Sequence, residues 1–218
     1  LLIDPEYAAA HNNIGSLLRA SGEHSQAIAQ FRRALDIDPN FAEAHYNLAT
    51  ASIELDQESD ALSHLQRAIE IQPTFPEARF AMGNLYRHQG NLDEALKHYR
   101  KVIEGGVKSA HAHNNVGVIL MERGYSQDAV QHFVETLRSD PENLEAHNNL
   151  GTAHQKLGHL DRALEHYRDA LRLKPDYAEA LSNIAGVLKA QGKLNEAVES
   201  YKAAIAAKPQ MITAHNNL

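Results

Sequence analysis

Asparagine returns at a fixed interval along the chain, and its side-chain amide is well suited to hold another polypeptide. Successive copies lie 34 residues apart, and a single slot of the series holds Ala81 instead. A primary amide carries two N–H donors and one carbonyl acceptor, so it can pair with a peptide backbone whatever side chains that peptide has. The series, called the asparagine row below, consists of Asn13, Asn47, Asn115, Asn149, Asn183 and Asn217.

Histidine is the second residue type with chemical potential, and the chain has 14 of them. Equivalent positions of successive units are separated by roughly a helix diameter, whereas each ligand of a zinc ion lies about 2 Å from it. One ion cannot join histidines of the same position, so we expect these side chains to pack rather than to bind metal. The two series are His11, His45, His113, His147 and His215, and then His64, His98, His132 and His166.

Catalysis and several partner classes are disfavoured by what the composition lacks. The chain has no cysteine, its net charge is −7, and its 21 basic residues form no tract that could neutralise a phosphate backbone. No nucleophile stands beside a base, and no Gly-rich phosphate loop is found. We therefore predict a chain that is not an enzyme, with no catalytic residue, no metal, no cofactor, no nucleic acid and no membrane partner; the cytoplasm is the default compartment.

The elements that position the asparagines are pairs of helices. In residues 144–177 the apolar residues from Ala146 to Leu157 follow the spacing of one helical face, and Gly158 can take a positive φ after the last turn. A second apolar pattern runs from Leu160 to Leu171, and Pro175 prevents the helix from continuing. Each unit is thus predicted to be a helical hairpin, with a helix A and a helix B.

The hairpin recurs along the whole chain, which predicts an all-α fold. Prolines mark the boundaries at the same 34-residue interval, except where Val107 takes the place of one. We expect one array over residues 1–218 in which each unit packs mainly on its neighbours. Its parts are the end of a preceding repeat (1–7), six full repeats (8–41, 42–75, 76–109, 110–143, 144–177 and 178–211) and the start of another (212–218).

The repeat resembles the tetratricopeptide repeat, whose pattern has a Leu-Gly pair, an Ala and an aromatic residue four apart, and a closing Pro. Residues 144–177 present Leu150-Gly151, Ala163, Tyr167 and Pro175, although His147 stands where the family usually has Trp. The resemblance implies a right-handed superhelical solenoid of antiparallel helix pairs whose helices A line a concave groove. The asparagine row resembles the ladder in the superhelix of O-linked N-acetylglucosamine transferases, where such side chains hold the backbone of an extended peptide.

Two alternatives for the asparagine row stay open at this stage. Each amide could bond to a neighbouring helix within the solenoid, or it could contact a peptide in the groove. Where Ala81 interrupts the row, Asn84 lies one turn further along the same helix and is the predicted substitute. Tyr46 and Phe80 occupy equivalent positions in adjacent units and form either a side-chain pocket or a buried contact.

Acidic residues share the expected groove side of helix A. They include Glu145, and they make the groove mildly acidic unless they are simply a solvated face. We accordingly expect an extended partner peptide that is neutral to basic. The acidic set is Glu43, Glu54, Glu77, Glu122, Glu145 and Glu179.

Two departures from the repeat have local consequences. At Glu104-Gly105-Gly106-Val107 the boundary proline is lost, which predicts an early end of helix B and a hinge. Asp56 stands where the other units have Gly, and Asp tolerates the left-handed conformation better than most residues.

Three functions follow from these observations. The first is a protein interaction module that binds extended polypeptide along the asparagine row. The second is the substrate-recruiting region of a larger protein glycosyltransferase, and the third is a scaffold that self-associates end to end. Because the array begins and stops within a unit, we expect it to be part of a longer chain or to pair through its ends.

Overall fold

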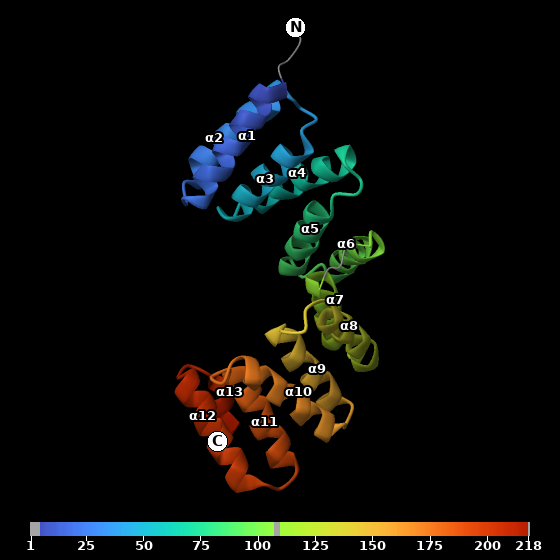
Figure 1. Ribbon diagram of the computed structural model, residues 1–218, viewed down its shortest axis with the longest axis vertical. Helices are drawn as coiled ribbons and strands as arrows, with labels where there is room; N and C mark the ends of the chain where they lie inside the picture. The colour runs from blue at the N-terminus through green and yellow to red at the C-terminus, as the bar shows by residue number, and fades with distance from the viewer. Residues whose placement is uncertain (1–4, 107–109, 218) are drawn as a thin grey trace. The chain divides into compact units, whose positions relative to one another are not determined.

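The computed structural model describes residues 5–106 and 110–217, and within these residues the chain forms helices and no strand. The predicted all-α class is therefore confirmed. The helices pack into two compact units, residues 1–107 and 108–218. In each unit consecutive helices run as antiparallel neighbours, so that each unit is a stack of hairpins (Figure 1).

The first unit contains three hairpins. Each helix contacts the next one along the chain, and the two leading helices α1 and α3 also contact each other. Its helices are α1 (Pro5–Ala20), α2 (His24–Ile37), α3 (Ala42–Ile53), α4 (Glu58–Ile71), α5 (Pro76–His88) and α6 (Leu92–Glu104).

The second unit contains three hairpins and a single further helix. Its helices A contact one another in the order α7, α9, α11 and α13, which places equivalent positions of successive repeats on neighbouring helices. The helices are α7 (Ala110–Glu122), α8 (Ser126–Ser139), α9 (Leu144–Lys156), α10 (Leu160–Leu173), α11 (Ala178–Ala190), α12 (Leu194–Ala207) and α13 (Ile212–Asn217).

The turn inside each hairpin depends on a residue with positive φ. Gly158 has a φ of +79°, and the N–H of His159 then reaches back to the carbonyl of His154 at 2.9 Å. This bond closes the end of helix A in the manner of a Schellman motif. Asp56 has a φ of 57° and carries the same turn, so the prediction that Asp is tolerated there is confirmed.

The core of a hairpin is a large ring laid against a position that lacks a side chain. Tyr167 of α10 is fully buried against Gly151 of α9, and Phe133 of α8 is buried in the same way against Gly117 of α7. The recurrent alanine of helix B allows this close approach. It is buried in every repeat, as Ala27, Ala61, Ala95, Ala129, Ala163 and Ala197.

Helix α6 ends one residue earlier than the other helices B, as predicted from its glycine pair. It has 13 residues where α4 has 14, and Gly106 follows it with a φ of +73°. The expected hinge extends to Val107, and residues 107–109 lie outside the described part of the chain. The hinge therefore stays a prediction.

In residues 5–106 and 110–217 no helix is both long enough and apolar enough to cross a bilayer.

Candidate functional site

In the first unit the asparagine row begins with a hydrogen bond between two helices A. Asn47 on α3 donates from Nδ2 to Oδ1 of Asn12 on α1, with the two atoms 2.9 Å apart. Asn12 is only 5% exposed, whereas its neighbour Asn13 is exposed on the same helix. Positions are counted from the first residue of each repeat, so that Asn13 is position 6 of the repeat 8–41. The bond therefore joins position 6 of one repeat, Asn47, to position 5 of the repeat before it, Asn12.

The second unit repeats this arrangement twice. Asn149 on α9 donates from Nδ2 to Oδ1 of Asn114 on α7 at 3.2 Å. Asn183 on α11 donates in the same way to Oδ1 of Asn148 on α9 at 2.9 Å. Each of these amides bonds to a neighbouring helix, which is the first of the two alternatives weighed from the sequence.

The two alternatives do not exclude each other, because a primary amide has more capacity than one bond uses. Each of these hydrogen bonds uses one N–H of the position-6 side chain and leaves its carbonyl oxygen and second N–H outside the bond. Asn47, Asn149 and Asn183 are all half-buried, so part of each side chain is accessible to solvent. The inter-helix bond therefore fixes the amide while keeping polar atoms available.

The position-5 asparagines were missed as partners by the sequence analysis. Asn114 is 7% exposed and Asn12 is comparably buried, so these side chains serve the interior. The signal that could have revealed them is the repeated Asn-Asn doublet. In Asn148-Asn149 the first residue accepts from Asn183 of the next repeat, and the second donates to Asn114 of the previous one. The doublets are Asn12-Asn13, Asn114-Asn115, Asn148-Asn149 and Asn216-Asn217.

The remaining members of the row have different surroundings. Asn115 on α7 is half-buried. Asn217 on α13 is exposed and donates from Nδ2 to the Thr213 carbonyl at 2.8 Å, while its own backbone carbonyl accepts from Lys189 Nζ at 3.2 Å.

The row is interrupted at Ala81, which follows the aromatic residue Phe80, and Tyr46 holds the position of Phe80 one repeat earlier. Tyr46 packs on Phe75 with ring centroids 5.2 Å apart, and Phe80 packs on Tyr99 at 5.6 Å. Both Tyr46 and Phe80 are half-buried. Burial also raises the pKa of Tyr46. These contacts favour the buried alternative for the two rings, and the side-chain pocket stays a prediction.

Asn84 has a contact that the sequence analysis did not expect. Its Oδ1 accepts a hydrogen bond from the hydroxyl of the core residue Tyr99 at 2.7 Å. In the second unit Thr152 occupies the same repeat position, and its Oγ1 lies 3.2 Å from the hydroxyl oxygen of Tyr167, whose proton goes to Oε1 of Gln155. Asn84 thus satisfies a buried tyrosine, and its predicted role as a substitute in the row is weakened to that extent.

Glu54 and Glu179 are acidic residues that form ion pairs. Glu54 is paired with Arg19 at 3.3 Å, and Lys208 pairs with Glu179 at 2.7 Å and lowers the pKa of that carboxyl. Glu145 lies exposed in the first turn of α9. Burial raises the pKa of Tyr177 to about 12, and the charges of Glu179 and Glu145 add to the effect.

The histidines form pairs within a hairpin, a relation that comparing equivalent positions did not reveal. His45 Nδ1 lies 2.9 Å from His64 Nδ1, and His113 Nδ1 lies 3.1 Å from His132 Nδ1. In the first hairpin Gln30 replaces the second histidine, and its Oε1 lies 2.7 Å from Nδ1 of the partner ring.

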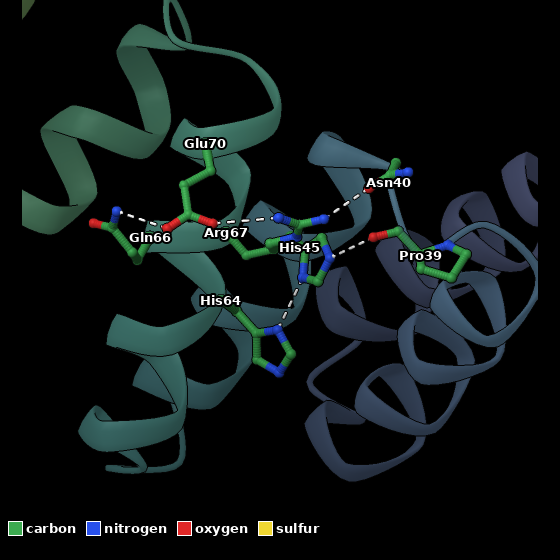
Figure 2. A network of polar contacts seen from close by, with 7 residues as sticks. All are labelled: Pro39, Asn40, His45, His64, Gln66, Arg67 and Glu70. Carbon is green, nitrogen blue, oxygen red and sulfur yellow. Dashed lines mark hydrogen bonds and ion pairs between the residues drawn. The ribbon is translucent and has the colours of Figure 1, made fainter.

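The position-4 histidine also closes the turn before its helix (Figure 2). His45 Nε2 donates to the carbonyl of Pro39 at 3.1 Å, and because a carbonyl only accepts, the proton of the neutral ring lies on Nε2. His64 then donates from Nδ1 to Nδ1 of His45. His45 is 8% exposed, so the predicted packed core histidine is found here, whereas His215 at the same position is exposed.

This pair predicts a pH-dependent stability. Burial is the main cause that lowers the pKa of both His45 and His64. For His45, the hydrogen bond to the Pro39 carbonyl raises the pKa in part, and the charge of the Arg67 guanidinium lowers it. The unfolded chain, with an ordinary histidine pKa of about 6.5, binds more protons below that pH than the folded chain does. The melting temperature should therefore fall as pH is lowered through about 6.5 toward the folded-state pKa values.

The variant His64→Gln provides the control for this prediction. Glutamine is the residue found opposite His11, and its amide can donate to His45 without titrating. Circular dichroism melts at a series of pH values should show a smaller loss of melting temperature in acid for the variant than for the parent chain. Identical losses in both proteins would contradict the assignment to this pair.

Comparisons with known proteins agree with the helical repeats. Models described as TPR repeat or tetratricopeptide repeat match residues 15–56, 42–75, 64–97 and 148–212. Together these matches cover more than half of the chain. A search of curated protein sequences found no match.

Solved structures show the same fold at low sequence identity. PilF of Pseudomonas aeruginosa superposes with a TM-score of 0.85 at 17% identity, covering 97% of this chain and 96% of that one. PilW, described as a type IV pilus biogenesis factor, gives 0.81 at 19% identity, covering 96% and 97%. YrrB, described as a TPR protein with an unusual peptide-binding site, gives 0.72 at 20% identity, covering 85% and 96%.

The repeated helical hairpins, the glycine-ring packing and the matching repeat models agree with one another over both units. The chain belongs to the tetratricopeptide repeat family.

Proposed function

We propose that the chain is a protein interaction module that binds extended polypeptide through the backbone of its partner, along the asparagine row. The observation that carries the proposal is that Asn47, Asn149 and Asn183 are each held by an asparagine of the preceding repeat. An amide oriented before binding loses little side-chain entropy when a peptide arrives, which favours affinity. As part of this proposal, the asparagine row acts like the asparagine ladder of the O-linked N-acetylglucosamine transferases, which it resembles.

The cost of asparagine inside a helix supports a use beyond packing. Asparagine is among the weaker helix formers, since its amide competes with the backbone for hydrogen bonds. The exposed Asn13 bears this cost near the middle of α1, where an alanine would give a more stable helix. A peptide contact would offset that cost.

The expected partner follows from the same chemistry. Amides that pair with a peptide backbone read its extended shape rather than its sequence. Exposed carboxylates such as Glu145 favour a neutral or basic peptide over an acidic one. YrrB, with its described peptide-binding site, is a precedent for this use of the fold.

Backbone recognition has a measurable period. Neighbouring helices A lie on the order of 10 Å apart, and an extended chain advances roughly 3.4 Å per residue, so consecutive amides meet about every third peptide residue. We expect N-methylation of a captured peptide, one residue at a time, to weaken binding with this period. Alanine substitution of its side chains should change affinity much less, because the side chains carry little of the contact.

The experiment needs a ligand first, which can be captured on the immobilised protein from a pool of random, unstructured peptides and identified by mass spectrometry. Fluorescence anisotropy then measures the affinities of the N-methyl and alanine series. A series in which alanine substitutions weaken binding strongly and N-methylation has no periodic effect would contradict backbone recognition.

A further inference from the structure

The hairpin of α9 and α10 brings together three side chains of the types that bind transition metals. His147 Nδ1 and His166 Nδ1 each lie 3.8 Å from Oδ2 of Asp169. The three ligand atoms lie within 4.8 Å of one another. Among the described residues, no other three His, Asp or Glu side chains bring their ligand atoms this close together. Arg172 pairs with the other carboxylate oxygen, Oδ1, and so helps to orient the carboxylate.

The two nitrogen atoms that face Asp169 are buried and lack a hydrogen-bond partner within the described part of the chain. Each nitrogen lies 3.8 Å from Oδ2, which is longer than the roughly 2.7–3.2 Å of a usual hydrogen bond. A buried polar atom without a partner costs free energy, so the cluster calls for a group that can contact all three atoms.

The tautomer of His147 is suited to a metal. Its Nε2 lies 3.0 Å from the carbonyl of Pro141, and since a carbonyl only accepts, the ring proton lies on Nε2. The lone pair of the neutral ring is therefore on Nδ1, toward the cluster. Metal-binding histidines commonly donate their second N–H to a backbone carbonyl, which fixes the ring and its tautomer.

The distances fit a small cation after a minor adjustment. Zinc binds histidine nitrogen and carboxylate oxygen at about 2.0–2.2 Å, so two of its ligand atoms in a tetrahedral site lie roughly 3.4 Å apart. The two histidine-to-aspartate separations of 3.8 Å differ from this by a few tenths of an ångström. The third separation, between the two Nδ1 atoms, is no more than 4.8 Å.

Equivalent positions in other repeats lack one part of the arrangement. His45 and His64 bond directly to each other. The residue equivalent to Asp169 in that repeat is Arg67, a cation that donates hydrogen bonds to Asn40 and Glu70 (Figure 2).

The repeat with His113 and His132 differs in another way. Its histidines also bond to each other, and Glu135 at the third position accepts from Arg138 with both oxygens, at 2.7 and 2.9 Å. The rings of that pair have centroids 5.2 Å apart, whereas those of His147 and His166 are 6.1 Å apart. The wider pair with a carboxylate beside it is the one spaced for an ion.

We propose that His147, His166 and Asp169 bind a divalent transition-metal ion, with Zn²⁺ as the ion of choice and water in its fourth position. Two imidazoles and one carboxylate suit zinc and its neighbours in the first transition row, whereas Mg²⁺ and Ca²⁺ prefer oxygen ligands alone. The ion would clamp α9 to α10 and so rigidify the repeat that carries Asn149. This site is independent of the peptide proposal.

The test is calorimetric titration of the full chain, free of any affinity tag and freed of metal by a chelator, with ZnCl₂. We expect one ion to bind per chain at this site, and Zn²⁺ to raise the melting temperature. Co²⁺ in place of Zn²⁺ should give the visible absorption bands of a four- or five-coordinate site, a readout that surface histidines do not imitate.

Two variants that the chain itself shows to be tolerated remove the ligands. His166→Gln introduces the residue found as Gln30 in the first repeat, and Asp169→Ala introduces the residue found as Ala203 in the last. Both should abolish the one-site isotherm and the Co²⁺ bands while keeping the helical circular dichroism spectrum. The matched control His64→Gln, in a repeat whose histidines bond to each other, should leave both unchanged.

Two results would overturn the proposal. One is that the parent chain binds no Zn²⁺ and that Zn²⁺ does not raise its melting temperature. The other is binding that His166→Gln and Asp169→Ala leave as strong as in the parent, or that His64→Gln weakens as much, because the ion would then be held by exposed histidines elsewhere.

Discussion

Replacing Gly151 with alanine is expected to destabilise the second unit markedly. A Cβ at this position of α9 would lie 2.6 and 2.7 Å from ring atoms of Tyr167 and 3.1 Å from the backbone carbonyl of Ala163. The ring cannot move away freely, because its hydroxyl donates to Gln155 at 2.8 Å. Overpacking of this kind costs about 1–3 kcal/mol, which exceeds the gain in helix propensity of up to about 1 kcal/mol.

Gly186 supplies the control, because it lies inside α11 with room for a methyl group. The nearest atom to an added Cβ there is the hydroxyl oxygen of Tyr201 at 3.7 Å, an ordinary contact distance. Alanine at this position should therefore stabilise the helix by up to about 1 kcal/mol. Thermal and denaturant unfolding should show opposite signs for the two variants, and shifts of the same sign would contradict this account of the core.

The fold could be predicted from the sequence because the residues that determine the helices and turns recur at the same positions in successive repeats. Ala163 and Tyr167 recur at a spacing that fixes one face of helix B, and Gly158 marks the turn where a positive φ is required. Even the exception at Asp56 follows the rule, since it adopts a φ of 57°. Local geometry repeated in register determines a stack of hairpins.

The site was predictable only in part, because its contacts join positions that differ within the repeat. The hydrogen bond from Asn183 to Asn148 joins position 6 to position 5, and comparing each position with itself does not reveal it. The same limit applied to the histidines. His147 and His166 come from the two helices of one hairpin, and only the packing of those helices brings both rings to Asp169.

Asn84 shows a further limit of sequence patterns. Its spacing from Ala81 suggested membership in the asparagine row, yet the hydroxyl of Tyr99 requires an acceptor, and Oδ1 of Asn84 supplies it. Whether a helical position serves the groove or the core depends on the ring opposite it. The spacing of one helix alone does not contain that information.

Peptide binding is expected to decrease strongly when Asn149 and Asn183 are both replaced by alanine. Each amide can offer one N–H and one carbonyl oxygen to a peptide beyond its bond to the preceding repeat. Four hydrogen bonds of about 0.7 kcal/mol each correspond to a loss of affinity of roughly a hundredfold. The single replacement Asn148→Ala is the control, because it removes the amide that accepts from Asn183 and leaves both row residues in the chain.

The most direct test of the account is the ratio of the peptide affinities of these two variants, measured by anisotropy at a temperature where circular dichroism shows both to be fully folded. The account predicts that Asn149→Ala with Asn183→Ala binds the captured peptide at least about tenfold more weakly than Asn148→Ala does, since the control removes no row amide. Equal affinities in both variants, with a lowered melting temperature in each, would show that the asparagine row only fastens one helix to the next.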